Sequence, residues 1–427
     1  MKEKKLTRRE FVRNSGLAAL GLMIVPRHVL GGRGYIAPSE TINRAVIGTG
    51  GMGRNHLTYP GARTVAICDV DKKHLELGME VCQNNGITGV KAYHDFREIL
   101  DRPDIDVVHI ASPPHWHGPM AVAAAEAGKD IWCEKPMTRT IAEGQRVIEA
   151  VQRNARIFRI NTWFRMGGEW YDSGATAEKL KKVVASGLLG SPVRLCLSDV
   201  TGFIWKLDQW SGRTDLVPEQ VPPELDYNFW LGPAPFKPYH PHRVHMSFRG
   251  YWDYDGGGLG DQGQHYTDPA QYILGKDDTF PVYIESEGPP QHPDAVGLWY
   301  RIVYRYANGD EILLEGQNPR PDAPLLEGPK GKVWPKMRST IPDLEKKLAA
   351  MPAFDPMETE FYDCVRNRKK FALNEETSHR SCSLLNLGKI AIRLRRPLRF
   401  DPVKQVFVND EEANRLIEEP MRAPWHV

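Results

Sequence analysis

The sequence has no low-complexity tract, no internal repeat and no hydrophobic run long enough to cross a membrane. The best candidate for a span, residues 15–25, falls short of the roughly 20 apolar residues that a membrane helix needs. A formal net charge of +2 gives no electrostatic indication of nucleic-acid binding. The six cysteines are scattered, with no Cys-x-x-Cys pair and no metal-type spacing, so we expect buried thiols and no disulfide scaffold.

The first 13 residues are rich in basic side chains, and Arg8-Arg9 precedes the uncharged stretch 14–26. This pattern is typical of a twin-arginine export signal, with an amphipathic N-terminal helix as the alternative. We therefore predict a signal segment over residues 1–34, recognition by the twin-arginine export machinery, and a periplasmic protein. Residues 29–31 match a small-residue cleavage site only loosely, so a cleaved leader and an uncleaved, membrane-tethered one both stay open.

A glycine-rich loop follows the first apolar, β-branched run at residues 42–47. Gly48, Gly50 and Gly53 form a Gly-x-Gly-x-x-Gly pattern, in which the glycines permit a tight turn, close approach of a pyrophosphate, and helix–strand packing. Asp69 ends the next apolar run, where a ribose-binding carboxylate is expected. A carboxylate there repels a 2′-phosphate, so the pattern favours NAD over NADP, although Lys72 and Lys73 could soften the preference.

Short apolar runs continue to alternate with helix-like stretches up to about residue 160, which predicts a parallel, doubly wound sheet. Beyond that point, residues 193–200, 282–287 and 298–316 indicate longer strands, and Asn308-Gly309 predicts a hairpin. Residues 217–223 and 318–330 are predicted loops. The fold class is thus α/β, with a dinucleotide-binding domain over residues 35–160 and an α+β domain with a mostly antiparallel sheet over residues 161–427.

Two stretches carry candidate catalytic groups. Lys135, in Glu134-Lys135-Pro136, follows a strand of the parallel sheet, where it could bind a substrate hydroxyl and stabilise a developing alkoxide. Asp261 and His265 follow a glycine run and would share one face of a helix. A neutral imidazole can accept a hydroxyl proton while the carboxylate orients the ring or steadies its positive charge. Taken singly, these residues could equally be a surface lysine, a helix N-cap and a core histidine.

Taken in order, the glycine loop with Asp69, the Ser112-Pro113-Pro114-His115-Trp116-His117 stretch, Glu134-Lys135-Pro136 and Asp261-x-x-x-His265 resemble the glucose–fructose oxidoreductase / inositol dehydrogenase / MocA (Gfo/Idh/MocA) family. The resemblance covers essentially the whole chain after residue 41, and the end of the chain resembles exported bacterial members. It implies a Rossmann domain followed by an open-faced sheet that often makes the dimer contact, with the last helices packing back on the Rossmann domain.

The resemblance also assigns roles to residues. It implies Lys135, Asp261 and His265 as the catalytic set. The residues expected to contact the cofactor are Gly48, Gly50, Gly51, Met52, Gly53, Asp69, Ser112, Pro113, His117, Glu134 and Lys135. Aromatic and cationic side chains suited to a sugar suggest Trp163, Arg165, Arg249 and Trp252 as substrate contacts. The histidines of residues 115–117 and 240–245 fit no standard metal spacing, so the sequence predicts no metal site.

The expected function is an NAD-dependent oxidoreductase acting on a secondary alcohol of a sugar, glycoside or polyol. A glycoside hydrolase or lyase that oxidises the ring only transiently ranks second. Family relatives of that kind place a key histidine in a Tyr-x-x-His segment with no obvious counterpart here, and Asp261-x-x-x-His265 resembles the dehydrogenases instead. A non-catalytic sugar- or nucleotide-binding protein ranks third. Because exported proteins lack a free NAD pool, we expect a tightly bound cofactor, and the resemblance implies a homodimer or homotetramer.

Overall fold

A six-stranded parallel sheet forms the first half of the molecule, in the strand order β3-β2-β1-β4-β5-β6. The computed structural model describes residues 41–427, so the predicted signal segment at residues 1–34 lies outside the described residues. The elements of this half, in chain order, are β1 (Asn43–Ile47), α3 (Gly51–His56), β2 (Arg63–Cys68), α4 (Lys72–Asn84), β3 (Lys91–Tyr93), α5 (Phe96–Leu100), β4 (Val107–Ile110), η2 (Pro114–Trp116), α6 (His117–Glu126), β5 (Asp130–Cys133), α7 (Ile141–Arg153) and β6 (Phe158–Ile160).

The alternation of strand and helix follows from local signals in the sequence. Strands β1, β4 and β5 are mostly apolar and almost fully buried, as expected of strands that helices cover on both faces. The side chain of Asp71 caps the N-terminus of α4, and that of Thr140 caps α7. The predicted doubly wound parallel sheet is therefore confirmed.

The second half contains an eight-stranded sheet in the order β12-β11-β7-β10-β9-β8-β13-β14. All its pairings are antiparallel except the parallel pair β7–β10, so the predicted mostly antiparallel sheet is confirmed. The elements are η3 (Phe164–Met166), η4 (Tyr171–Ser173), α8 (Ala177–Ala185), β7 (Arg194–Leu197), η5 (Asp199–Thr201), α9 (Tyr227–Leu231), η6 (Pro241–Arg243), η7 (His245–Gly250), α10 (Gly257–Leu274), β8 (Tyr283–Glu287), β9 (Arg301–Arg305), β10 (Glu311–Glu315), β11 (Leu326–Gly328), β12 (Gly331–Val333), η8 (Pro335–Met337), α11 (Leu344–Ala349), α12 (Phe361–Asn367), α13 (Glu375–Leu394), β13 (Leu398–Asp401), β14 (Val406–Phe407) and α14 (Glu411–Asn414).

Three local predictions can be compared directly with the structure. The Asn308-Gly309 turn joins β9 to β10 as expected. The strand predicted at residues 193–200 ends at Leu197, because Ser198 and Thr201 form a capping box that starts η5. The predicted loop at 318–330 is wrong in its last part, where β11 pairs with β7 and β12.

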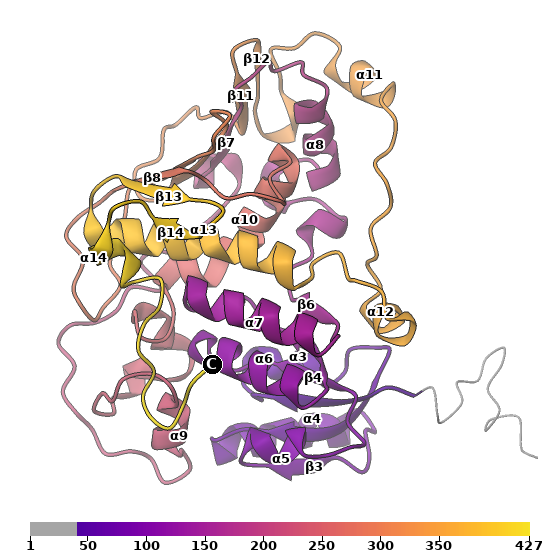
Figure 1. The fold of residues 1–427 in the computed structure, drawn as a ribbon, viewed down its shortest axis with the longest axis vertical. Helices are drawn as coiled ribbons and strands as arrows, with labels where there is room; N and C mark the ends of the chain where they lie inside the picture. Colours follow the sequence, from indigo (N-terminus) through magenta and orange to yellow (C-terminus); the bar gives the residue numbers. More distant parts are fainter. Residues whose placement is uncertain (1–40) are drawn as a thin grey trace, which may run out of the picture. The chain divides into compact units, whose positions relative to one another are not determined.

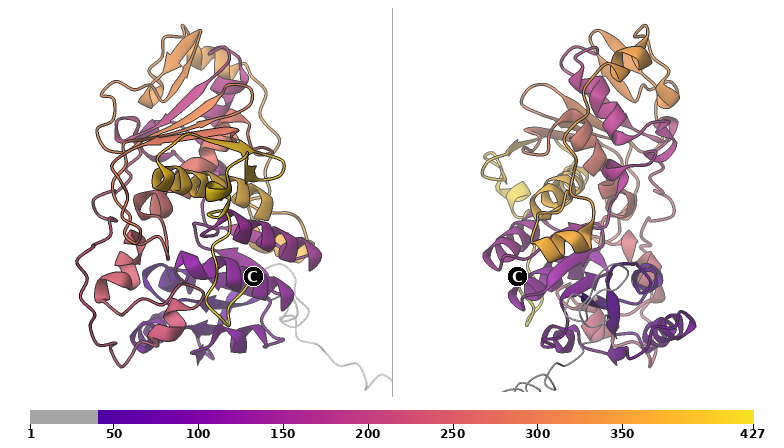
Figure 2. Two further views of the ribbon diagram at one scale, coloured as in Figure 1. Left: turned by 60° about the vertical axis from the view of Figure 1, so that its left-hand side comes forward. Right: turned by 90° about the vertical axis from the view of Figure 1, so that its right-hand side faces the viewer.

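Helices α10 and α13 connect the two halves. Both pack against the second sheet, and α13 also lies along α7 of the first half (Figure 1). Gly144 of α7 allows this contact, since a Cβ there would lie 2.2 Å from the His379 ring in α13. The end of the chain also returns to the first half (Figure 2). There Trp425 packs against Trp116, and it also packs against Phe229 of α9.

The described cysteines are all free and buried, as predicted. Among residues 41–427, no helix combines the length and the apolar character that a membrane crossing would require.

Candidate active site

A cavity of about 380 Å³ opens at the carboxyl ends of β1, β2, β4 and β5. Ligands of open α/β sheets bind at this edge, because the loops that follow the strands leave a crevice there. Its walls come from both halves of the chain: the glycine loop and Asp69 on one side, and residues 229–261 on the other. The fold thus brings the predicted cofactor loop and two of the three predicted catalytic residues, Lys135 and Asp261, into one cavity.

The glycine loop has the tight backbone geometry that a phosphate-binding loop requires. Gly48 has a φ of +87°, and a Cβ at Gly53 would lie 1.8 Å from the Gly48 carbonyl oxygen, so neither position accepts a side chain without movement. At Gly51 a Cβ would meet nothing within 4 Å, which leaves room beside the first turn of α3. Free backbone N–H groups at a helix N-terminus attract anions such as a pyrophosphate.

Asp69 lies beside this loop at the end of β2. Its Oδ2 accepts a hydrogen bond from the Thr49 backbone N–H at 2.7 Å, and its Oδ1 accepts one from the Asp71 N–H at 2.9 Å. Asp69 also lines the cavity, as a carboxylate that binds ribose hydroxyls must. The predicted loop contacts Gly48, Gly50, Gly51 and Met52 line the cavity too, whereas Gly53 lies behind them.

Lys135 and Asp261 meet at the inner end of the cavity. The Lys135 Nζ donates to the Asp261 backbone carbonyl at 2.7 Å and to Asp261 Oδ1 at 3.1 Å. Arg249 Nε donates to the same Oδ1 at 2.9 Å, and Trp210 Nε1 donates to Oδ2 at 2.9 Å. Burial alone would raise the pKa of Asp261, but Lys135 and Arg249 hold it well below its usual range. The carboxylate therefore stays ionised and fixes two cations beside the cavity.

His265 lies one helical turn after Asp261 on α10, and both are buried. The structure corrects the expected partnership, because the hydrogen bond that orients the imidazole joins His265 Nδ1 and Thr162 Oγ1 at 3.1 Å. Asp261 instead serves the two cations. Burial, with the Lys135 charge acting in the same direction, lowers the pKa of His265 to about 3. His265 is thus neutral at physiological pH, although it is not part of the cavity wall in this conformation.

The helix that carries these two residues begins earlier than predicted. The glycines at 257–260 form its first turn instead of preceding it. A Cβ at Gly258 would lie 2.0 Å from the Trp205 carbonyl oxygen, and one at Gly263 would lie 1.8 Å from Leu385. The glycines therefore allow close packing of α10 and so fix the positions of Asp261 and His265.

The other predicted cofactor residues divide into two groups. Ser112, Pro113 and Glu134 line the cavity. His117 does not; its ring nitrogens lie 2.6 Å from the Pro136 carbonyl and 2.8 Å from the Ser112 carbonyl, so it holds two cavity-lining loops together. Glu134 accepts hydrogen bonds from Asn161 at 2.5 Å and, through Oε1, pairs with His56 Nε2 at 2.8 Å.

Of the predicted substrate residues, Arg249 alone lines the cavity. Trp163 is 44% exposed and packs against the His265 ring, with centroids 5.2 Å apart. The predictions for Arg165 and Trp252 are not supported by their positions. Arg165 is buried in ion pairs with Asp268 and Asp277, and Trp252 donates to the His292 carbonyl away from the cavity.

The sequence did not reveal several cavity residues. His74 and His245 line its rim although they are far apart in the chain, and Phe229 and Trp230 enter from α9. Asp255, just before the glycine run, also lines the cavity, and burial raises its pKa to about 6. The signal available for His245 was the histidine-rich stretch 240–245, but nothing in it indicates contact with the first half.

Comparison with known families identifies both halves. Residues 42–162 match the family described as "Oxidoreductase family, NAD-binding Rossmann fold". Residues 173–427 match "Oxidoreductase family, C-terminal alpha/beta domain" of the same family. The chain belongs to the Gfo/Idh/MocA oxidoreductase family.

Individual relatives of this Gfo/Idh/MocA chain match it at low identity and over only part of their length. Inositol 2-dehydrogenase of Salmonella typhimurium is 33% identical over 159 residues, which cover 36% of this chain and 44% of that protein. A glycosyl hydrolase family 109 protein of Shewanella pealeana is 29% identical over 174 residues, which cover 36% of this chain and 38% of that protein. The matched part thus spans less than half of either relative.

Among solved structures, the WlbA dehydrogenase from Bordetella pertussis, in complex with NADH and UDP-GlcNAcA, has a TM-score of 0.56 and 18% identity. The likeness covers 84% of this chain and 99% of that one. At this level of identity it establishes the shared fold, with a Rossmann domain followed by a sheet domain.

Proposed function

We propose that this protein is an oxidoreductase that uses NAD to transfer hydride at a secondary alcohol of a sugar, glycoside or polyol. The observation that carries the proposal is one cavity with a glycine cradle and a ribose-type carboxylate at one end and the Lys135–Asp261 pair at the other. The domains at residues 35–160 and 161–427 would supply the cofactor loop and the substrate side, respectively.

The residues present fit a nicotinamide dinucleotide. Gly51 leaves free space beside the N-terminus of α3, and Asp69 lies in the cavity wall, where it could accept hydrogen bonds from ribose hydroxyls. The Asp69 carboxylate would repel a 2′-phosphate, which supports NAD over NADP. When bound, the nicotinamide would supply a hydride acceptor or donor, which no amino-acid side chain provides.

The protein's own groups would handle the proton and the oxygen. We expect the Lys135 ammonium to bind the substrate oxygen and to favour its alkoxide form. His265, kept neutral by burial, is available to accept the hydroxyl proton once substrate reaches it. Because an imidazole with so low a pKa is a weak base, the lysine must acidify the alcohol for the transfer to occur. Asp261 would hold Lys135 and Arg249 in place.

The carbohydrate substrate class is supported by the relatives' names, inositol 2-dehydrogenase among them. Arg249, which lines the cavity, is suited to bind a sugar hydroxyl or carboxylate. We also propose export to the periplasm with NAD already bound, because the twin-arginine route, which the sequence predicts for residues 1–34, carries folded proteins. A captive cofactor would then be regenerated on the enzyme by a second substrate or by a redox-neutral reaction. We further propose a homodimer or homotetramer.

A redox-neutral glycosidase is the second candidate, and the Shewanella pealeana relative favours it. Oxidation of a ring hydroxyl acidifies the neighbouring C–H, so that a glycosidic bond could be eliminated before the hydride returns. One Tyr-x-x-His spacing does occur, at Tyr239 and His242, but neither side chain lines the cavity. His242 Nδ1 instead lies 2.7 Å from the Tyr251 hydroxyl. The geometry therefore favours the dehydrogenase.

The deciding experiment is to denature the purified protein and to identify released nucleotide by mass spectrometry. Near-stoichiometric NAD(H) is expected. The protein is then incubated with polyols, sugars and glycosides, and the products are analysed. A keto sugar supports the dehydrogenase, whereas release of the aglycone without net oxidation supports the glycosidase. Failure to bind either NAD or NADP would refute both.

A further inference from the structure

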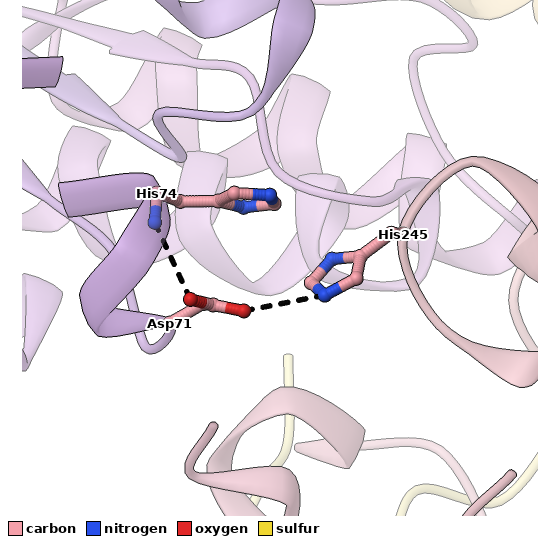
Figure 3. Close-up of side chains that lie close together, drawn as sticks. All are labelled: Asp71, His74 and His245. Carbon is pink, nitrogen blue, oxygen red and sulfur yellow. Dashed lines mark hydrogen bonds and ion pairs between the residues drawn. The ribbon is translucent and has the colours of Figure 1, made fainter. Parts of the chain in front are cut away.

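Three side chains that commonly bind metal ions lie close together (Figure 3), and two of them, His74 and His245, line the cavity. They are Asp71, His74 and His245, and each offers one ligand atom within 4.8 Å of the other two. Asp71 Oδ2 lies 3.2 Å from His245 Nε2, and the two imidazole rings have centroids 4.5 Å apart. The first two residues come from the start of α4, whereas His245 begins η7 in the other half of the chain.

The backbone holds these side chains in fixed positions, as a metal site requires. Asp71 caps α4 with one oxygen, because Oδ1 accepts hydrogen bonds from the Lys73 N–H at 2.8 Å and the His74 N–H at 3.3 Å. Its Oδ2 therefore remains for His245. His245 has a φ of +52°, a left-handed conformation that is uncommon outside glycine and clusters at functional positions.

The surrounding segment is also held against α4. The Lys72 N–H donates to the Glu224 carbonyl at 3.0 Å, and the Asp226 N–H donates to the Val70 carbonyl at 3.1 Å. The chain around residues 224–245 thus crosses the rim of the cavity from one half to the other. The position of His245 beside Asp71 fits this wider contact.

The donor atoms and their spacing suit a divalent transition metal. One carboxylate oxygen and two imidazole nitrogens are ligands that Zn²⁺ accepts at about 2.0–2.2 Å, which places neighbouring ligands of a tetrahedral ion about 3.3 Å apart. The observed 3.2 Å between Asp71 Oδ2 and His245 Nε2 matches that edge. The ligand nitrogen of His74 lies within 4.8 Å of the other two ligand atoms.

The electrostatic surroundings favour a cation. Asp69 Oδ2 lies 3.7 Å from His74 Nδ1, so a carboxylate stands beside a ligand imidazole, as it commonly does around bound metals. Asp71 is buried, while the side chains of His74 and His245 keep 26% and 38% of their surface exposed. An ion at this point would have three protein ligands and an open position for water.

We propose that Asp71, His74 and His245 bind one divalent transition-metal ion of the Zn²⁺ class. The ion links α4 to the start of η7 and so fixes residues 240–250 at the rim of the cavity. This site is separate from Lys135, Asp261 and His265, and its existence does not depend on the proposed reaction.

The test uses the full chain, purified and stripped of metal with a chelator. Titration calorimetry with Zn²⁺ should give one equivalent, and Co²⁺ should give visible d–d bands without a thiolate charge-transfer band. His74→Gln and His245→Gln should each weaken Zn²⁺ binding at least ~100-fold, because each removes a direct ligand. His94→Gln is the matched control: His94 also lines the cavity but pairs with Asp226, and its loss should leave the affinity unchanged. Asp71 is left intact because it caps α4.

A second measurement tests whether the ion fixes residues 240–250. Zn²⁺ should slow amide hydrogen exchange in residues 240–250 of the wild-type protein, and it should not do so in His245→Gln, whose melting temperature should match that of the wild-type apoprotein. Absence of stoichiometric binding overturns the proposal. So does binding that persists in both histidine variants, since the ion would then reside elsewhere.

Discussion

At the residue scale, the site depends on how each charged group is held. Asp261 is ionised because the charges of Lys135 and Arg249 outweigh the effect of burial on its pKa. His265 is neutral because no neighbouring charge outweighs the effect of burial on its pKa. Two residues four positions apart on one helix thus differ in charge, one being ionised and the other neutral. Their roles differ accordingly: Asp261 orders cations, and His265 is available to accept a proton.

Replacing His265 with asparagine should lower turnover about 10²- to 10⁴-fold, the usual contribution of a general base. Nucleotide retention should be unchanged, because His265 is not part of the cavity wall. Steady-state kinetics and mass spectrometry of released nucleotide measure the two effects. As a matched pair, Thr162→Val should lower kcat by about tenfold through loss of the hydrogen bond to Nδ1, and Thr162→Ser should restore it. Loss of nucleotide in His265→Asn would contradict the assignment.

Asp69→Ser should shift cofactor preference toward NADP by at least ~10-fold, because a serine hydroxyl does not repel a 2′-phosphate. Titration of nucleotide-free protein with NAD and with NADP gives the ratio. Asp101→Ser changes an exposed carboxylate that does not line the cavity, so it should leave the ratio as it was. An unchanged ratio in Asp69→Ser would mean that this carboxylate does not face the ribose.

At the scale of elements, glycine fixes where two helices can lie. In the cofactor loop it lets α3 approach β1, and in α10 it lets a wholly buried helix pack on Trp205 and Leu385. Both helices carry functional groups at their N-terminal ends. Close packing therefore determines the position of the phosphate cradle and of Asp261.

Gly53→Ala tests this packing. Its Cβ would lie 1.8 Å from the Gly48 carbonyl oxygen, so α3 must move away from the loop. We expect the free energy of unfolding to fall by at least about 2 kcal/mol and nucleotide binding to be lost. Gly51→Ala is the control, because its Cβ meets nothing within 4 Å, and its urea unfolding midpoint should stay at the wild-type value. Equal stability of the two variants would contradict the packing argument.

At the scale of the whole molecule, many histidines are buried in their neutral form. Burial lowers the pKa of His115 and His265 to about 3 and that of His379 to about 4, and it also lowers that of His109. In the unfolded chain each takes up a proton below about pH 6.5. The contribution of these histidines to the free energy of unfolding is complete above about pH 6.5. It is lost as the pH falls toward the pKa values that they have in the folded protein.

The free energy of unfolding should therefore decrease on acidification below about pH 6.5, by roughly 1.4 kcal/mol per pH unit for each proton taken up on unfolding. Asp255 and Asp268 oppose this, because burial raises their pKa to about 6 and the folded state then holds their protons. The histidines outnumber them. Urea titrations between pH 7 and pH 5 measure the slope of the free energy of unfolding against pH. His379→Gln should reduce this slope by the contribution of about one proton, roughly 1.4 kcal/mol per pH unit. A slope of zero in the wild-type protein would contradict the prediction.

Much of this fold could be predicted from the sequence because it depends on interactions between neighbouring residues in the chain. The glycine loop, Asp69 and the Asn308-Gly309 turn depend on backbone conformation over a few residues, so their patterns are visible in the chain itself. The predicted loop at 318–330 failed at β11, because that strand exists only through its pairing with distant strands. The sequence could not show that Arg165 and Trp252 lie outside the cavity wall, because the partners that hold them there, Asp268, Asp277 and His292, are far along the chain.

The sequence by itself determined the two-part α/β architecture, the cofactor loop and the residues Lys135, Asp261 and His265 as candidates, since periodicity, glycine spacing and motif order are properties of the linear chain. Only the tertiary structure decided that Asp261 pairs with Lys135 and Arg249, that Thr162 orients His265, and that His245 meets Asp71 and His74. These partners come from strands, helices and loops that are separated in sequence. Charge pairing and ligand geometry act over a few ångströms in space, and the packing of the two halves sets those distances.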